Sequence, residues 1–162
     1  MQKEIERIVG RYCLARGNGG SFDLESFEFA IRSSMHGIGC SLIEILANAD
    51  GGDYRGSMIA GEEGHEYEFI EYRDKKLLTA LGSVTVKRAY YYDREHKRGY
   101  CPKDRTLDIE GTSYSSGVRR MMSRVGAYRP FGLGREDLYE LADIRVSAKE
   151  VERISQMVGG QA

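Results

Sequence analysis

The segment 147–158 has the residue types and the spacing of a helix that reads DNA bases. A Ser-x-x-Glu capping box at 147–150 starts a helix by satisfying its first free amide groups. Val151, Ile154 and Val158 recur on one helical face, and this spacing predicts that the face packs inward. A charged face then remains for a partner.

That outward face combines cationic and amide side chains. Arginine can fork to guanine and glutamine can pair with adenine in the major groove. A short helix at 131–142 and a turn at 143–145 precede the segment, which is the layout of a helix-turn-helix. The alternative is an ordinary helical hairpin with a solvated charged face. The residues predicted to face outward are Ala148, Lys149, Glu152, Arg153 and Gln156, and we predict base contacts from Lys149, Arg153 and Gln156.

A second set of basic residues precedes this segment. Lysine and arginine contacts to phosphates position a protein on DNA without reading its sequence. The predicted phosphate contacts are Arg119, Arg120, Arg124, Lys87 and Arg88, and the first three lie mostly off the apolar stripe of their helix.

Metal-binding residue types occur in two predicted turns. Asp93 and His96 are three residues apart, Cys101 follows five residues later, and His65 lies on the far side of a predicted hairpin. Two opposed turns with such ligands have the arrangement of a zinc ribbon. The alternative is four surface residues in charged turns, because strong zinc sites carry paired cysteines and this chain has no CxxC.

The sequence offers no active site. It contains no Ser-His-Asp order, HExxH or phosphate-loop motif. Asp104 and Asp108 come nearest to a carboxylate cluster, and we expect both to lie in a surface loop. We therefore expect no catalytic residue and no required cofactor in this chain, with zinc as the one weak exception.

Charge is distributed unevenly over the 162 residues. The whole chain has a net charge of −1, so bulk charge predicts no partner. Residues 1–70 carry −6, residues 71–106 carry +5 and residues 107–162 are neutral. A local basic block can bind a phosphate backbone, although a mixed-charge solvated ribbon is the simpler interpretation.

The periodicity of apolar residues predicts an α+β fold. We expect helices at 2–16, 24–47, 112–128, 131–142 and 147–158, a β-ribbon over 66–92, and a tight charged turn at 93–105. These elements group into an N-terminal helical region (1–64), a β-ribbon (65–106) and a helix-turn-helix-like region (107–162).

The helix at 24–47 carries an apolar stripe close to a heptad repeat. Its members are Leu24, Phe27, Ile31, Met35, Ile38, Leu42 and Ile45. Such a stripe either packs on the chain's own core or pairs with a second copy. A homodimer through 24–47 is therefore an open prediction.

Composition indicates a cytoplasmic protein. No apolar run is long enough for a membrane helix, and the charged N-terminus is unlike a signal peptide. The three cysteines, Cys13, Cys40 and Cys101, are scattered and odd in number, which excludes a disulfide framework within the chain.

The stretch from about 65 to 160 resembles the N-terminal half of insertion-sequence transposases of the ISKra-four type. The matching elements are LG at 81–82, RAYY at 88–91, Gly99, Pro102, Asp104, TSYSSGVRR at 112–120 and a Leu-Ala-x-x-x-Val-Ser-x-Lys segment that ends at Lys149. They occur in order and with few gaps, so together they are more specific than any single motif.

The resemblance implies a modular enzyme. A zinc-ribbon-like and helix-turn-helix front end recognises the element ends, and a ribonuclease-H-like domain with Asp, Asp, Glu and Mg²⁺ cuts and joins DNA. Many relatives carry a CxxC where this chain has Asp93 and His96. We expect the catalytic domain to lie beyond this chain, so the cleavage chemistry transfers to none of its residues.

The sequence therefore predicts the DNA-recognition portion of such a transposase, associated with the nucleoid and binding the terminal repeats as double-stranded DNA. The first alternative is a non-catalytic oligomerisation or regulatory module, for example a truncated transposase that acts as an inhibitor. The others are an intact nuclease and an inert relic.

Overall fold

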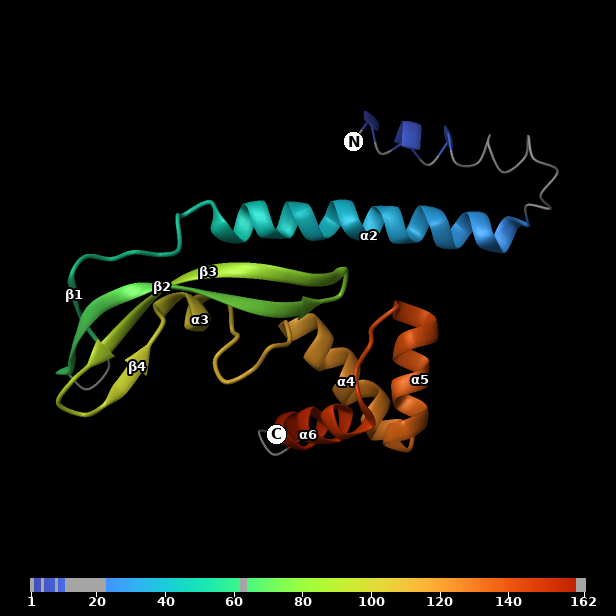
Figure 1. Cartoon of the computed structure of the whole chain (residues 1–162). Helices are drawn as coiled ribbons and strands as arrows, with labels where there is room; N and C mark the ends of the chain where they lie inside the picture. The colour runs from blue at the N-terminus through green and yellow to red at the C-terminus, as the bar shows by residue number, and fades with distance from the viewer. Residues whose placement is uncertain (1, 4, 8, 11–22, 62–63, 160–162) are drawn as a thin grey trace.

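A computed structural model of the chain describes residues 2–3, 5–7, 9–10, 23–61 and 64–159. Helices and an antiparallel sheet combine in an α+β fold, as predicted (Figure 1). Residues 2–3, 5–7 and 9–10 are helical, in agreement with the predicted first helix, whose remainder lies outside the described residues. None of the described helices combines the length and the hydrophobicity that crossing a membrane requires.

The first long element is helix α2, Leu24–Asn48. Asp23 caps it, because its side chain accepts a hydrogen bond of 2.7 Å from the amide of Ser26. The predicted helix is confirmed. The C-terminal half of α2 runs along the sheet, and its N-terminal half extends past the hairpin turn toward α5 (Figure 1).

The sheet has the order β1-β2-β3-β4 and is antiparallel throughout. Its strands are β1 (Met58–Ala60), β2 (Glu66–Thr79), β3 (Gly82–Asp93) and β4 (Arg98–Tyr100). The predicted ribbon is the long β2–β3 hairpin, which turns tightly between Thr79 and Gly82. Gly82 has a φ of 132°, a conformation that side chains disfavour, which explains a glycine at this turn.

Helix α2 covers the free edge of β3. The side-chain amide of Asn48 donates to the carbonyl of Thr85 at 2.9 Å, and its oxygen accepts from the amide of Lys87 at 2.8 Å. Glu44 accepts from the amide of Thr85. These side chains take the place of a neighbouring strand, so this part of the edge is not left open for another chain.

The segment 93–105 differs from the prediction of a tight turn. It contains β4 and a short helix α3, Pro102–Thr106, and several of its side chains are buried. Both elements are too short for periodicity to reveal them.

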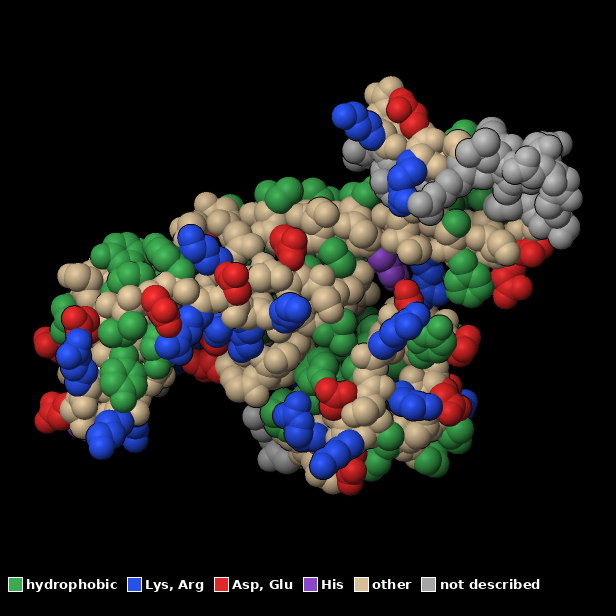
Figure 2. Space-filling model, viewed as in Figure 1, with side chains coloured by type: hydrophobic (Ala, Val, Ile, Leu, Met, Phe, Trp, Pro, Cys, Tyr) green, Lys and Arg blue, Asp and Glu red, His purple; other side chains and the backbone are tan. Residues whose placement is uncertain are grey.

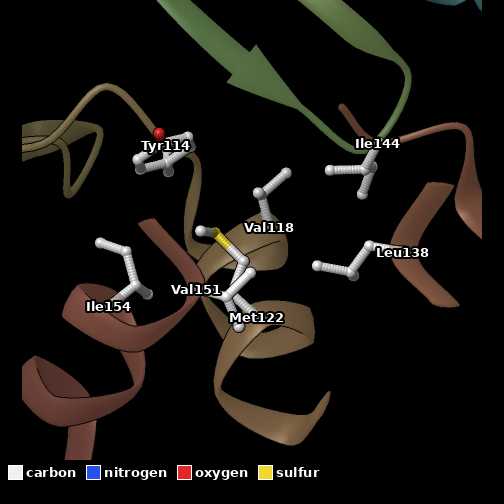
Figure 3. Packing of buried hydrophobic residues seen from close by; sticks show 7 residues of the cluster. All are labelled: Tyr114, Val118, Met122, Leu138, Ile144, Val151 and Ile154. Carbon is white, nitrogen blue, oxygen red and sulfur yellow. The ribbon is translucent and has the colours of Figure 1, made fainter. Parts of the chain in front are cut away.

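Three helices form the C-terminal part: α4 (Ser116–Tyr128), α5 (Phe131–Ala142) and α6 (Ala148–Gly159). Ser115 caps α4 by accepting from the amide of Val118. The hydrophobic side chains between the three helices point toward one another in a common core (Figure 3). The members shown are Tyr114, Val118, Met122, Leu138, Ile144, Val151 and Ile154.

The hairpin and the three helices are joined by a short bridge beside the hairpin turn. The amide of Leu78 donates to the carbonyl of Ser113 at 2.8 Å, and the amide of Ser115 donates to the carbonyl of Leu78 at 2.9 Å. This parallel bridge fixes the start of α4 relative to the sheet.

Candidate functional site

Helix α6 begins with the predicted capping box. The hydroxyl of Ser147 accepts from the amide of Glu150 at 3.2 Å, and the Glu150 carboxylate accepts from the amide of Ser147 at 2.8 Å. Val151 and Ile154 are fully buried, as their spacing predicts. Val158 was predicted to pack inward but is 36% exposed, because it lies in the last turn of the helix.

The opposite face of α6 is open to solvent. Lys149, Arg153 and Gln156 are all exposed and lie on one side of the helix. Gln156 donates to Glu152, one turn earlier, through a contact of 3.4 Å. The three residues predicted to contact bases therefore form one accessible surface, which we call the α6 face.

The connection from α5 to α6 is short and sharply bent. Asp143 ends α5 in the left-handed conformation, with a φ of 53°, and its amide donates to the carbonyl of Tyr139. The amide of Ile144 donates to the carbonyl of Leu138, and the Ile144 side chain is buried in the helical core. This turn ends α5 and sets the direction of α6.

Two features that the sequence did not indicate position α6: a close approach to α4, and a hydrogen bond from Tyr114, which lies just before α4. A side chain on Gly126 would come within 2.1 Å of the Ser155 hydroxyl, so the glycine permits the close approach of the helices. Tyr114 donates a short hydrogen bond to Glu150. That bond holds the pKa of Glu150 below its ordinary value, and burial raises the pKa of Tyr114 to about 12.

The predicted phosphate contacts do not gather around α6. Arg88 binds Asp104 at 2.6 Å with its side chain only 13% exposed, and Arg119 binds Asp108 and is also largely covered. Their partners, Asp104 and Asp108, lie in α3 and in the loop before α4. Sequence spacing does not show that these partners contact the two arginines. Both arginines are engaged within the protein, so we leave them out of the proposal below.

The remaining three predicted phosphate contacts are exposed on other surfaces. Arg120 and Arg124 line a groove of about 440 Å³ between α4 and α5, to which α6 contributes no described residue. Lys87 lies on the sheet, with its ammonium 4.1 Å from the centre of the Tyr72 ring.

A histidine and aspartate cluster lies at the end of the sheet away from the hairpin turn. His65 precedes β2, Asp93 ends β3, and His96 lies in the turn before β4. Ligand atoms of these three residues lie within 4.8 Å of one another, and Cys101 does not join this group of described residues. Three of the four weak metal candidates are therefore brought together.

Asp93 is held firmly within this cluster. It is 4% exposed, and its Oδ1 accepts hydrogen bonds from the amides of Glu95 and His96 at 2.9 and 3.1 Å. Burial opposes its ionisation, but the hydrogen bonds from His96 and Glu95 outweigh burial and keep the pKa of Asp93 below its ordinary value. The carboxylate is thus charged and fixed in orientation.

Part of this chain matches a known protein family. Residues 42–125 match the model of a family described as "Uncharacterised protein family (UPF0236)". That match covers just over half of the 162 residues. The chain belongs to family UPF0236. No curated protein matches it.

Some of the candidate residues lie inside the UPF0236 match and others lie outside it. It includes the sheet, the Arg88–Asp104 pair and the cluster of His65, Asp93 and His96. Helices α5 and α6 lie beyond it, so the α6 face is outside the part of the chain that the UPF0236 model matches.

Proposed function

We propose that this chain is a DNA-binding module of an insertion-sequence transposase and recognises the element ends through α6. The α6 face carries the proposal: Lys149, Arg153 and Gln156 are exposed together, opposite the buried Val151 and Ile154. Helix α5, a five-residue connection and α6 resemble a helix-turn-helix in order and spacing. In this mode α6 lies in the major groove.

The α6 face has side chains suited to both kinds of contact. Arg153 can donate two hydrogen bonds to guanine, and Gln156 can pair with adenine. The positive end of the α6 helix dipole lies at its capped start and favours a nearby phosphate. Arg145, in the connection before α6, has a side chain that is 76% exposed. We add it as a phosphate contact in place of the five predicted ones, which are covered or lie on other surfaces.

The first test measures binding to terminal-repeat DNA and to unrelated DNA at two salt concentrations. Substitution Arg153→Ala is expected to weaken binding to the terminal repeats by about 1–3 kcal/mol and to reduce the preference over unrelated DNA. Fluorescence anisotropy measures both affinities. The physical reason is the loss of two charge-assisted hydrogen bonds to one base.

The matched control is Arg120→Ala, which removes an exposed arginine from the groove between α4 and α5. If DNA lies on the α6 face, this variant keeps the sequence preference and nearly the same dependence on salt. A loss as large as that of Arg153→Ala would move the binding surface to the α4–α5 side and contradict the proposal.

A second candidate function is self-association through α2. None of the residues in α2, all of which the structure describes, is buried. Most members of the predicted stripe are exposed, and Cys40, Ile43 and Ala47 on the other side pack against the sheet. Figure 2 shows hydrophobic side chains along the side of α2 that faces away from the sheet.

The spacing of the exposed stripe favours a second copy of α2 as its partner. Leu24, Ile31, Ile38 and Ile45 recur at every seventh residue, and Met35 and Leu42 fill the intervening position of the last heptads. A stripe sustained over about three heptads is typical of coiled coils. Ile5 and Val9 are the nearest described apolar residues before α2. Both side chains are about half exposed, so neither is buried against the stripe.

We expect the purified chain to be a dimer and Leu42→Glu to be a monomer, because a charge in the seam would be desolvated on pairing. Sedimentation equilibrium at several concentrations measures the mass of each. The control is Ala30→Glu, which adds the same charge to α2 outside the stripe and should leave the dimer intact. A wild-type chain that stays monomeric at high concentration rules this candidate out.

A further inference from the structure

The cluster of His65, Asp93 and His96 brings three possible metal-ligand atoms into direct contact. The Oδ2 of Asp93 lies 2.7 Å from the Nδ1 of His96 and 3.4 Å from the Nδ1 of His65. The two Nδ1 atoms lie 2.9 Å apart. Three polar atoms of different residues thus form a triangle with sides of 2.7, 2.9 and 3.4 Å.

Among the three atoms themselves, a charged carboxylate and two neutral imidazoles cannot all be joined by good hydrogen bonds. If both Nδ1 atoms carry hydrogen, two N–H groups point at each other across 2.9 Å. If only one of the two Nδ1 atoms carries hydrogen, the other presents a lone pair. That lone pair either faces the lone pairs of the Asp93 carboxylate or must share the single N–H donor with it. A positive ion bound by all three atoms removes the conflict, because each then contributes a lone pair.

The size of the triangle fits a metal ion. Two ligands bound to Zn²⁺ at about 2.0–2.1 Å lie about 3.3 Å apart in a tetrahedral site. The three observed separations, 2.7, 2.9 and 3.4 Å, reach this value with shifts of about 0.6 Å or less. Neutral imidazole and carboxylate are ligands that Zn²⁺ and related transition ions accept.

The support around the ligands is also suitable. The second oxygen of Asp93 is already occupied by two backbone amides, which aim Oδ2 at the histidines. His65 and Asp93 are largely covered, with side chains 17% and 5% exposed, and His96 is open to solvent at 43%. An ion can therefore enter from the His96 side and keep a water as its remaining ligand.

We propose that His65, Asp93 and His96 bind one divalent transition-metal ion, with Zn²⁺ as its natural occupant. The site is independent of the proposed DNA contact, since it lies at the opposite end of the sheet from the hairpin turn beside α4 (Figure 1). The bound ion links His65, which directly precedes β2, to the turn between β3 and β4. Strands β1 and β4 have only three residues each, so the link fixes both edges of the sheet.

The test is a titration of the metal-free full chain with Zn²⁺ and, separately, with Co²⁺. We expect one ion per chain by calorimetry, visible absorption from the bound Co²⁺, and a higher midpoint of thermal unfolding with Zn²⁺. Mg²⁺ in excess should not compete, because it prefers oxygen ligands.

Variants distinguish this site from others in the chain. His65→Ala and His96→Ala should each weaken Zn²⁺ binding by about tenfold or more, whereas His36→Ala on α2 should bind as the wild type does. Cys101→Ser should leave the affinity and the Co²⁺ spectrum unchanged. Asp93→Asn keeps an oxygen for the two amides and removes the charge, so weaker binding by a chain that is still folded points to ligation.

Circular dichroism of each metal-free variant establishes that it is folded before metal is added. Wild-type affinity in His65→Ala or His96→Ala would overturn the proposal, as would the absence of Zn²⁺ uptake by the wild-type chain. An equal loss in His36→Ala would also overturn it, because that loss would place the ion elsewhere.

Discussion

Replacing Asp104 with asparagine should destabilise the fold by about 3–5 kcal/mol. The Oδ2 of Asp104 accepts from the Nη1 of Arg88 at 2.6 Å and from the Nζ of Lys75 at 3.3 Å. The three side chains are only 13–15% exposed. Asparagine is nearly the same size but carries no charge, so two cations would remain in a poorly solvated space without a counter-ion.

Urea denaturation followed by far-ultraviolet circular dichroism measures this loss. The matched control is Asp108→Asn, which removes the charge from the pair with Arg119. Asp108 is 71% exposed and its backbone carbonyl still accepts from Arg119 in the variant, so we expect a loss of about 1 kcal/mol or less. Similar losses in both variants would show that the burial of the Asp104 network does not matter for stability.

Local signals in the sequence were sufficient for the longer elements. The apolar spacing of 24–47 and the capping box at 147–150 each mark a helix that the structure contains. The alternation of residues in 82–93 likewise gives the long hairpin. Each of these signals depends on neighbouring residues, which is why the sequence reveals it.

The ion pairs could not be predicted in the same way. Arg88 and Asp104 lie on different elements, and their contact depends on how α3 folds back on the sheet. The sequence shows the charges but not their partners, so an arginine predicted to bind phosphate is bound inside the protein. Asp104 was for the same reason predicted to lie in a surface loop and is buried.

The candidate sites fall between these cases. The α6 face depends on one helix and its cap, and its exposure agrees with the prediction. The histidine cluster depends on two turns facing each other, which a hairpin brings close but does not fix, so Cys101 was grouped with it and lies apart. The stripe on α2 was recognised, but its periodicity does not show that another set of residues contacts the sheet.

Replacing Met122 with alanine should destabilise the C-terminal helices by about 2–5 kcal/mol. Met122 is fully buried among side chains of α4, α5 and α6, so the shorter side chain leaves a cavity at the centre of their core (Figure 3). Met121, on the same helix, is only partly buried at the margin of that core, and Met121→Ala is the matched control with a smaller loss.

The helical core and the two clusters of buried residues in the sheet are separate groups, linked near Leu78 and Tyr114. Met122→Ala should therefore weaken the proposed DNA binding by unfolding the helices that present α6, while the proposed Zn²⁺ site in the distant cluster is retained. Thermal unfolding of the variant, followed by circular dichroism and by the spectrum of bound Co²⁺, measures both regions. Simultaneous loss of both signals at one temperature would show that the sheet and the helices unfold as a single unit.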